Sequence, residues 1–147
     1  MAFTPHITVA SIVEQDGRFL FVRERTSRGI VINQPAGHLD PDETLEQAAV
    51  RETLEETGWH GEPFAITGIY LYLAPNGVTY QRLCFAARPL GAKENAQLDQ
   101  EIIEPLWLTK QQLQAEQKQW RSPLVMQCVQ DYLNGPHYPL HMLKGIF

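Results

Sequence analysis

Three glutamates near the middle of the chain are spaced so that they share one face of a helix. Glu55 and Glu56 lie three and four residues after Glu52, which is the spacing of one helix face. Carboxylates this close repel one another by about 1 kcal/mol per pair in water, and by several times more in a cleft of lower dielectric. A divalent cation removes this repulsion, and Mg²⁺ prefers hard oxygen ligands alongside water and phosphate oxygens. These residues therefore predict a metal site that acts on phosphate groups.

The alternative is that these acids are ordinary solvated residues of a surface helix, with Arg51 adding a local ion pair. Against this alternative, the side of the helix that carries the acids is apolar in its first half, and a second side of the helix is also weakly polar. The residues of these two sides are Leu45, Ala48, Ala49, Val50, Leu54 and Thr57. A helix packed on more than one face leaves little room for its acids to be fully solvated, so we expect them to face a cleft.

The helix that carries these acids has clear ends in the sequence. It is predicted over residues 44–57, because Thr44 and Gln47 have the spacing of a capping box and Gly58 stops it. Strand patterns cover residues 6–14, 19–25, 30–32, 66–73, 79–88 and 102–108, and further helices are expected near 109–118 and 122–134. Turn residues at 15–18 and 74–77 predict two hairpins, a loop is expected over 33–37, and the tail from 135 to 147 is expected to be irregular. We therefore predict one α+β domain over residues 1–147.

Composition narrows the function further. The 147 residues are 44% hydrophobic and 20% charged, with a formal net charge of -5, which indicates a globular domain and disfavours long nucleic acid as a partner. The start has no secretory pattern and no window is long enough to span a membrane, so we expect a cytoplasmic protein without membrane contact. Cys84 and Cys128 are far apart and are expected to be buried, with no disulfide and no zinc site. Neither a phosphate-binding P-loop nor a serine nucleophile motif occurs.

Residues 37–59, GHLDPDETLEQAAVRETLEETGW, resemble the Nudix box. The positions that match its fixed residues are Gly37, Glu43, Arg51, Glu52, Glu55, Glu56 and Gly58. Thr53 and Trp59 stand where aliphatic residues are usual, which affects packing rather than chemistry. Further segments, at 5–10, 33–39, 121–125 and 138–140, resemble a group of bacterial phosphatases within this superfamily. The resemblance implies a Nudix fold, with a mixed sheet sandwiched between helices.

The same resemblance implies roles for the matched residues. Glu52, Glu55 and Glu56 would be metal ligands, together with the carbonyl oxygen of Gly37. Glu52 would also orient or deprotonate the attacking water. The catalytic residues would be Glu52, Glu55 and Arg51. Arg51 would hold the loop through Glu43 rather than touch substrate. Glu43 and Gly58 would be structural, and the cofactor would be Mg²⁺ or Mn²⁺.

The phosphatase resemblance implies hydrolysis of nucleoside triphosphates and diphosphates and of pyrimidine-type diphosphates such as hydroxymethylpyrimidine diphosphate, with release of orthophosphate. The residues expected to contact this small phosphorylated substrate are Gln34, His38, Arg23, Arg25, Tyr70 and Tyr72, with Arg28, Arg82 and Tyr80 as further candidates. Each arginine could instead be a solvated charge, each tyrosine could instead fill the core, and His38 could equally be structural. The protein would act as a monomer or homodimer.

Two other functions are alternatives to this phosphatase activity. Pro75 lies 16 positions beyond Trp59, a distance that resembles a mark of ADP-ribose hydrolases, so ADP-ribose is the second candidate substrate. The other alternative is a Nudix-fold sensor that binds a nucleotide without cutting it. Such sensors usually lack the acids of the box, and Glu52, Glu55 and Glu56 are all present here.

Overall fold

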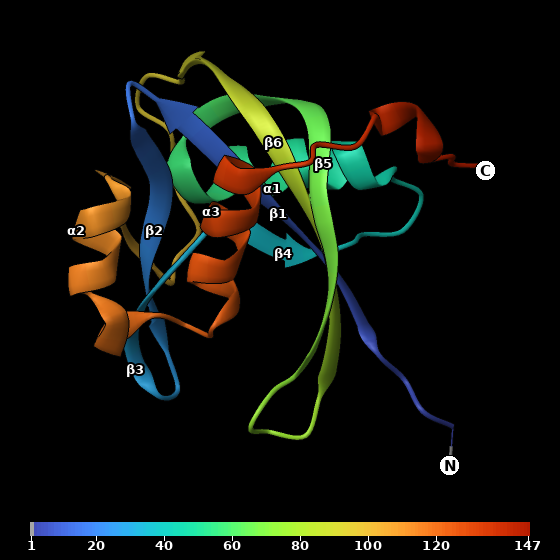
Figure 1. Cartoon of the computed structure of the whole chain (residues 1–147), viewed down its shortest axis with the longest axis horizontal. Coiled ribbons are helices and arrows are strands. Elements are labelled where there is room, and N and C mark those ends of the chain that lie inside the picture. The colour runs from blue at the N-terminus through green and yellow to red at the C-terminus, as the bar shows by residue number, and fades with distance from the viewer. Residues whose placement is uncertain (1) are drawn as a thin grey trace.

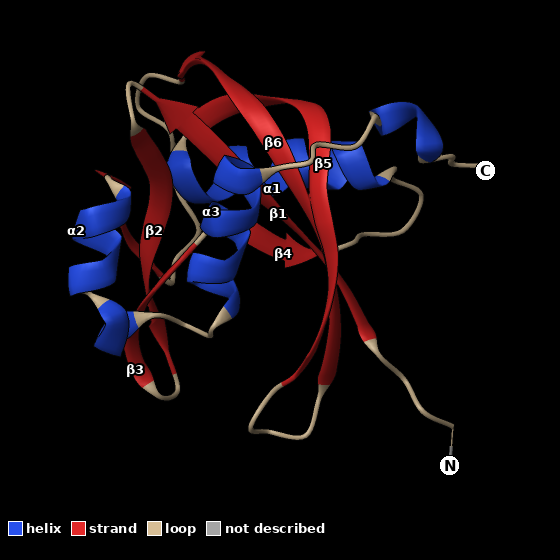
Figure 2. Cartoon of the chain, viewed as in Figure 1, coloured by secondary structure: helices blue, strands red, loops and turns tan. Residues whose placement is uncertain are grey.

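A mixed β-sheet with helices on both of its faces forms the body of the protein in a computed structural model, which describes residues 2–147 (Figures 1 and 2). Met1, the first residue of the predicted domain, lies outside the described residues. The strands are β1 (His6–Gln15), β2 (Arg18–Thr26), β3 (Gly29–Asn33), β4 (Ala36–His38), β5 (Trp59–Leu73), β6 (Thr79–Ala92) and β7 (Ile102–Leu108). The helices are α1 (Leu45–Thr57), α2 (Lys110–Ala115) and α3 (Leu124–Asn134), with short 3-10 helices at Gln117–Gln119 and Leu140–Met142. The predicted α+β class and mixed sheet are confirmed.

The sheet has the order β3-β2-β1-β6-β5, with β4 added on β1 and β7 on β2. Strands β1 and β6 run parallel, whereas every other pair is antiparallel. Asp16 and Gly17 both have positive φ, 53° and 78°, as the tight turn between β1 and β2 requires. Only two residue pairs join β1 to β2 next to this turn. Beyond them β2 pairs with β3 and β7 instead, so the two halves of the sheet separate.

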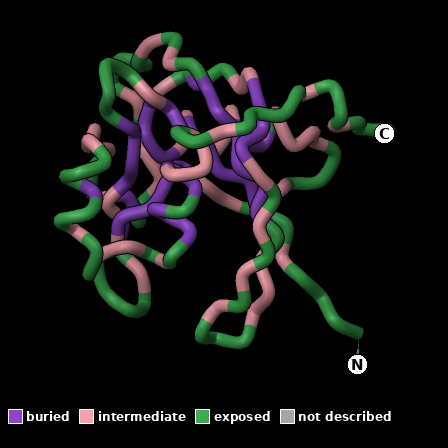
Figure 3. The backbone as a smooth tube through the Cα atoms, viewed as in Figure 1, coloured by how far each residue is buried: buried purple, intermediate pink, exposed green. Residues whose placement is uncertain are grey.

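The core is divided between the two faces of the sheet, and the buried segments gather at the centre of the molecule (Figure 3). Val9 of β1 packs with Ala48 and Ala49 of α1 on one face. Its neighbour Ala10 packs with residues of α3, including Cys128, on the other face, as the alternation of side chains along a strand demands. Cys84 and Cys128 are both buried, as predicted, and both are free cysteines. No helix within residues 2–147 is long and apolar enough to cross a membrane.

Helix α1 begins and ends where the sequence predicts. The hydroxyl of Thr44 accepts from the backbone N–H of Gln47 at 3.1 Å, and the Gln47 side chain accepts from the Thr44 N–H at 2.9 Å. Gly58 closes the helix at φ 77°, a conformation that favours glycine. This capping box fixes the position of every residue that follows on the helix.

Several boundaries differ from the prediction, and two of the differences involve pairing between distant residues. The expected loop at 33–37 contains the start of β4, because Ala36–His38 pairs with Thr8–Ala10 of β1. Strand β5 begins at Trp59 and pairs with β6 through three irregularities that obscure its alternation. The helix expected at 109–118 ends at Ala115 and continues as a 3-10 turn.

Candidate functional site

Three carboxylates gather at the C-terminal half of α1. One carboxylate oxygen from each of Glu52, Glu56 and Asp99 lies within 4.8 Å of the other two. Asp99 comes from the segment between β6 and β7, and its N–H donates to the carbonyl of Glu55 at 3.0 Å, which docks this segment on the helix. The arrangement offers a hard cation a set of oxygen ligands on two separate elements.

Burial makes this group of carboxylates hard to ionise together. Glu56 is 6% exposed, and burial raises its pKa to about 9, although the N–H of Ala36 donates to its carboxylate at 2.9 Å. Burial also raises the pKa of Glu52, against the opposing effect of Arg51, and raises the pKa of Asp99. A divalent cation among the three groups would offset both their desolvation and their repulsion. The donor set therefore fits a hard divalent cation.

Gly37 leaves the space that the Glu52 carboxylate occupies. A Cβ atom at residue 37 would overlap all three terminal atoms of the Glu52 side chain. Gly37 is held in β4 opposite Val9, so its backbone cannot move aside without breaking strand pairing. The glycine is thus explained by close approach rather than by a special backbone angle.

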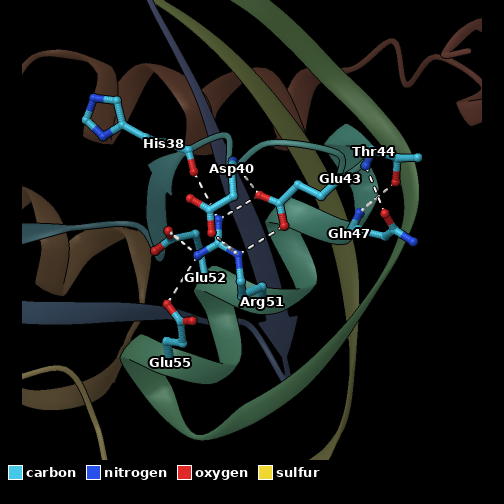
Figure 4. A network of polar contacts seen from close by, with 8 residues as sticks. All are labelled: His38, Asp40, Glu43, Thr44, Gln47, Arg51, Glu52 and Glu55. Carbon is cyan, nitrogen blue, oxygen red and sulfur yellow. Dashed lines mark hydrogen bonds and ion pairs between the residues drawn. The ribbon is translucent and has the colours of Figure 1, made fainter. Parts of the chain in front are cut away.

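Arg51 joins the loop that precedes α1 to the helix (Figure 4). Its Nε and Nη2 donate to the two carboxylate oxygens of Glu43 at 3.0 and 2.7 Å, a paired geometry that suits a guanidinium. Nη2 also donates to the carbonyl of His38 at 3.0 Å, and Nε lies 3.3 Å from the Asp40 carboxylate. The Arg51 hydrogen bond lowers the pKa of Glu43. The predicted contact between Arg51 and Glu43 is present.

The remaining guanidinium nitrogen of Arg51 reaches the acids of the helix. Nη1 donates to Glu52 at 2.8 Å and to Glu55 at 3.2 Å (Figure 4). Glu43 and Glu52 hold the pKa of Arg51 above its ordinary value, with the hydrogen bond to Glu43 contributing most. The Glu55 side chain is 42% exposed and lies outside the three-carboxylate group. Asp99, not predicted from the sequence, completes that group instead.

A cleft of about 940 Å³ opens beside these acids. Glu52, Glu56 and Asp99 line one part of it. Elsewhere the lining includes three further acids, Glu24, Asp40 and Glu101, and a set of cationic and aromatic side chains, which are Arg25, Arg28, Arg82, Arg121, His38, Tyr72 and Tyr80. The cleft therefore has an acidic end suited to a cation and a larger region suited to an anionic ligand that carries a ring.

Of the predicted substrate contacts, three line the cleft: His38, Arg25 and Tyr72. Burial, His6 and Arg121 all lower the pKa of His38, which favours its neutral form. His38 Nε2 lies 3.4 Å from Nδ1 of His6 on the neighbouring strand β1.

The other three predicted contacts lie away from the cleft. Arg23 donates to Gln119 at 2.7 Å. The hydroxyl of Tyr70 donates to Asp131 of α3 at 2.6 Å, and its ring packs on the core. Gln34 is fully buried, where its amide nitrogen donates to the carbonyl of Val125 at 2.6 Å. Each of these three side chains is held by a contact with another part of the chain.

Arg121 is a cleft residue that the sequence did not reveal as one. It donates to Glu24 at 2.6 Å, and Glu24 is 5% exposed. The backbone N–H of Arg121 donates to the carbonyl of Ile32 at 2.9 Å, which ties the start of the α3 segment to β3. A local signal was absent because Glu24 and Arg121 are almost a hundred residues apart.

Clustered carboxylates at the end of a helix, beside a cleft in a helix-covered mixed sheet, define a class of hydrolase suited to phosphorylated small molecules. The NUDIX domain family model matches residues 3–128. The chain therefore belongs to the Nudix family, and it is an enzyme of the phosphatase or pyrophosphatase type.

Known relatives cover nearly the whole chain. Phosphatase NudJ of Escherichia coli strain K12 is 36% identical over 141 residues, which are 96% of this chain and 92% of the relative. A solved NUDIX hydrolase from Nitrosomonas europaea is 41% identical, with a TM-score of 0.94 and coverage of 97% and 98%. An ADP-ribose pyrophosphatase from Streptococcus suis is 18% identical, with a TM-score of 0.68 and coverage of 92% and 96%, and shares the fold alone.

Proposed function

We propose that the protein is a Mg²⁺-dependent hydrolase of nucleoside triphosphates and diphosphates and of pyrimidine-type diphosphates such as hydroxymethylpyrimidine diphosphate, with release of orthophosphate. The observation that carries this proposal is the grouping of Glu52, Glu56 and Asp99 at one end of the cleft. The similarity to a bacterial phosphatase over 96% of the chain supports the release of orthophosphate. Residues 1–147 would act as one domain, since β1 and β6 contribute to the core on both faces of the sheet.

The metal would be held by Glu52, Glu56 and Asp99, with the Gly37 carbonyl and Glu55 as further ligands predicted from the Nudix box. When bound, Mg²⁺ neutralises charge on phosphate oxygens and lowers the pKa of bound water, and Mn²⁺ could substitute for it.

The chain itself positions the reacting groups. Glu52 is oriented by Arg51 at 2.8 Å and by the absence of a side chain at Gly37. Its carboxylate would accept the proton of the attacking water. Arg51 acts through Glu43 and the His38 carbonyl by holding the loop in register with the helix. Arg25 and Arg121 lie in the cleft, where they would bind phosphate oxygens, and Arg121 is also paired with Glu24 at 2.6 Å.

The test is a phosphate-release assay over nucleotides, ADP-ribose and thiamine-related diphosphates, with Mg²⁺ and with excess chelator. We expect turnover only with the metal, and losses of orders of magnitude in kcat for Glu52→Gln, Glu56→Gln and Asp99→Asn. Glu46→Gln, on the first turn of the same helix, is the matched control and should retain activity. Full activity in chelator, or near-native rates for all three variants, would overturn the proposal.

ADP-ribose hydrolysis is the second candidate, because Pro75 of the β5–β6 turn lines the cleft and could contact the distal part of a longer substrate. Its products, AMP and ribose phosphate, distinguish it from orthophosphate release. A kcat/KM for ADP-ribose well above that for any nucleoside diphosphate would favour this candidate. A sensor without catalysis would instead bind nucleotides and release no product at any metal concentration.

A further inference from the structure

Arg82 is a buried cation at the wall of the cleft. It lies on β6, is 7% exposed and lines the cleft together with Asn33. Its Nη1 donates to the amide oxygen of Gln34 at 3.0 Å and lies 3.8 Å from the sulfur of Cys128, while Nη2 donates to Asn33 at 3.2 Å. Gln34 is itself held by the carbonyl of Val125. These buried contacts fix the plane of the guanidinium.

No carboxylate among residues 2–147 lies within 4.0 Å of the Arg82 guanidinium. Its oxygen partners are neutral amides, so they orient the charge without cancelling it. Three of its five N–H groups are accounted for by these contacts, which leaves Nε–H and one Nη2–H. No fully buried side-chain nitrogen in the described residues lacks a partner. The free Nε–H is therefore not fully buried, and Arg82 is one of the residues that line the cleft.

Strand pairing places aromatic rings next to Arg82 on the same face of the sheet. Arg82 pairs with Tyr70 of β5 and Thr8 of β1, and Tyr80 pairs with Tyr72 and His6. Residues two apart on a strand point to the same face, so the row Tyr72–Tyr80 lies directly beside the row that contains Arg82. Both tyrosines line the cleft, whereas Tyr70 is covered by α3. The result is an aromatic surface with a hydrogen-bond donor along one edge.

This edge is separate from the acidic end of the cleft. Arg82 shares the sheet face that packs on α3, as its neighbour Cys84 shows, whereas α1 with its acids packs on the opposite face. The more exposed Arg25 and Arg121 also line the cleft and can serve the phosphates. A flat ring is the ligand that matches both the tyrosines and the single fixed donor edge.

We propose that Arg82 selects the organic half of the substrate by donating hydrogen bonds to acceptor atoms on the edge of a heterocycle that lies on Tyr72 and Tyr80. The inference rests on the proposed function and adds the residue that would recognise the ring of such a diphosphate through its carbonyl oxygens or ring nitrogens. Arg82 is thus a specificity-determining residue, and Gln34 and Asn33 are its positioning residues.

The test compares two diphosphates that differ in the ring. Orthophosphate release from uridine diphosphate and from methyl diphosphate is measured for the wild type, Arg82→Met and Arg82→Lys. We expect Arg82→Met to lose about 10- to 100-fold in kcat/KM on uridine diphosphate, mainly through KM, with little change on methyl diphosphate. Arg82→Lys, which keeps the charge but not the planar fork, should show a similar loss. It takes the place of Arg82→Met in the comparison if Arg82→Met does not fold. Arg88→Met, on the same strand outside the cleft, is the matched control.

Calorimetric titration with uridine monophosphate and ribose 5-phosphate gives a second measurement that does not need turnover. Arg82→Lys should weaken binding of the first by about 10-fold or more and leave the second unchanged. Equal losses on both members of either pair would show that Arg82 binds phosphate or acts only in folding. No loss for the ring-bearing member would also overturn the inference. A wild type that binds uridine monophosphate but hydrolyses neither diphosphate would refute the proposed function. The titration of Arg82→Lys would then decide the role of Arg82 by itself.

Discussion

Replacing Glu56 by Gln should make the metal-free protein more stable while it removes activity. Burial raises the pKa of Glu56 to about 9 from the ordinary 4.5. At about pH 7.5 this carboxyl is protonated in the folded state and ionised in the unfolded state. The free energy of unfolding is therefore lowered by about 1.4 kcal/mol for each of about three pH units above the ordinary pKa, or about 4 kcal/mol in all. Gln is neutral at every pH and retains an oxygen to accept from the N–H of Ala36. The variant should therefore recover most of this free energy of unfolding.

The sign follows from the raised pKa. Below about pH 4.5 the carboxyl is protonated in both folded and unfolded chains, so Glu56 carries no penalty there. The penalty grows as the pH rises, and it is complete near pH 9, where the folded carboxyl finally ionises. The difference in unfolding free energy between Glu56→Gln and the wild type should increase over this window. Mg²⁺ should reverse the order, because it binds and stabilises only the wild type.

The assay is urea unfolding in chelator at several pH values between about 4.5 and 9, with Tm as a second measure, since about 1 kcal/mol shifts Tm by roughly 2–4 °C in a chain of this size. Glu46→Gln removes the same charge from the same helix outside the carboxylate group and should bring no gain. A Glu56→Gln protein that is no more stable than the wild type at about pH 7.5, or whose difference from it does not change with pH, would refute the reasoning.

Three further predictions concern the same site. Gly37→Ala should drive a Cβ into the Glu52 carboxylate and lower both turnover and the free energy of unfolding, the latter by about 1–3 kcal/mol in urea; normal kinetics would contradict the close approach. Arg51→Lys loses the paired contact with Glu43, so kcat should fall by about 10-fold or more on every substrate, and a loss confined to one substrate would point to substrate contact instead. Asp99→Asn should weaken Mg²⁺ binding, measured by titration, more than Glu55→Gln does; the reverse order would restore the ligand set predicted from the sequence.

The features predicted well from the sequence are those that local residues determine. Helix α1 matches the prediction at both ends because Thr44, Gln47 and Gly58 act within one turn of the helix. The contact of Arg51 with Glu43 was also accessible, because both residues belong to one contiguous motif. Helix and strand patterns predicted the α+β class, and the family resemblance added the Nudix fold.

The features that were missed depend on contacts between distant parts of the chain. Asp99 lies in a segment without helix or strand periodicity, and only the docking of that segment on α1 brings its carboxylate to Glu52. Tyr70 and Tyr72 share a residue type and a face, and both pack against the core, but Tyr70 is hydrogen-bonded to Asp131 of α3 and only Tyr72 lines the cleft. Periodicity along β5 carries no information about where a helix from the other end of the chain stops.

Stability and activity measured on one variant separate two explanations of the acidic stripe. If Glu56 were retained for folding, its replacement by Gln would leave the fold weaker or unchanged, because an adapted structural contact would be lost. The buried carboxylate instead has one backbone donor and two nearby acids, a surrounding that disfavours its charged form. A residue that destabilises the metal-free fold must be held for another reason, and binding a cation is the role that its neighbours permit. An inactive and more stable Glu56→Gln protein would therefore assign the acids to chemistry, whereas an inactive and less stable one would leave loss of structure as the cause.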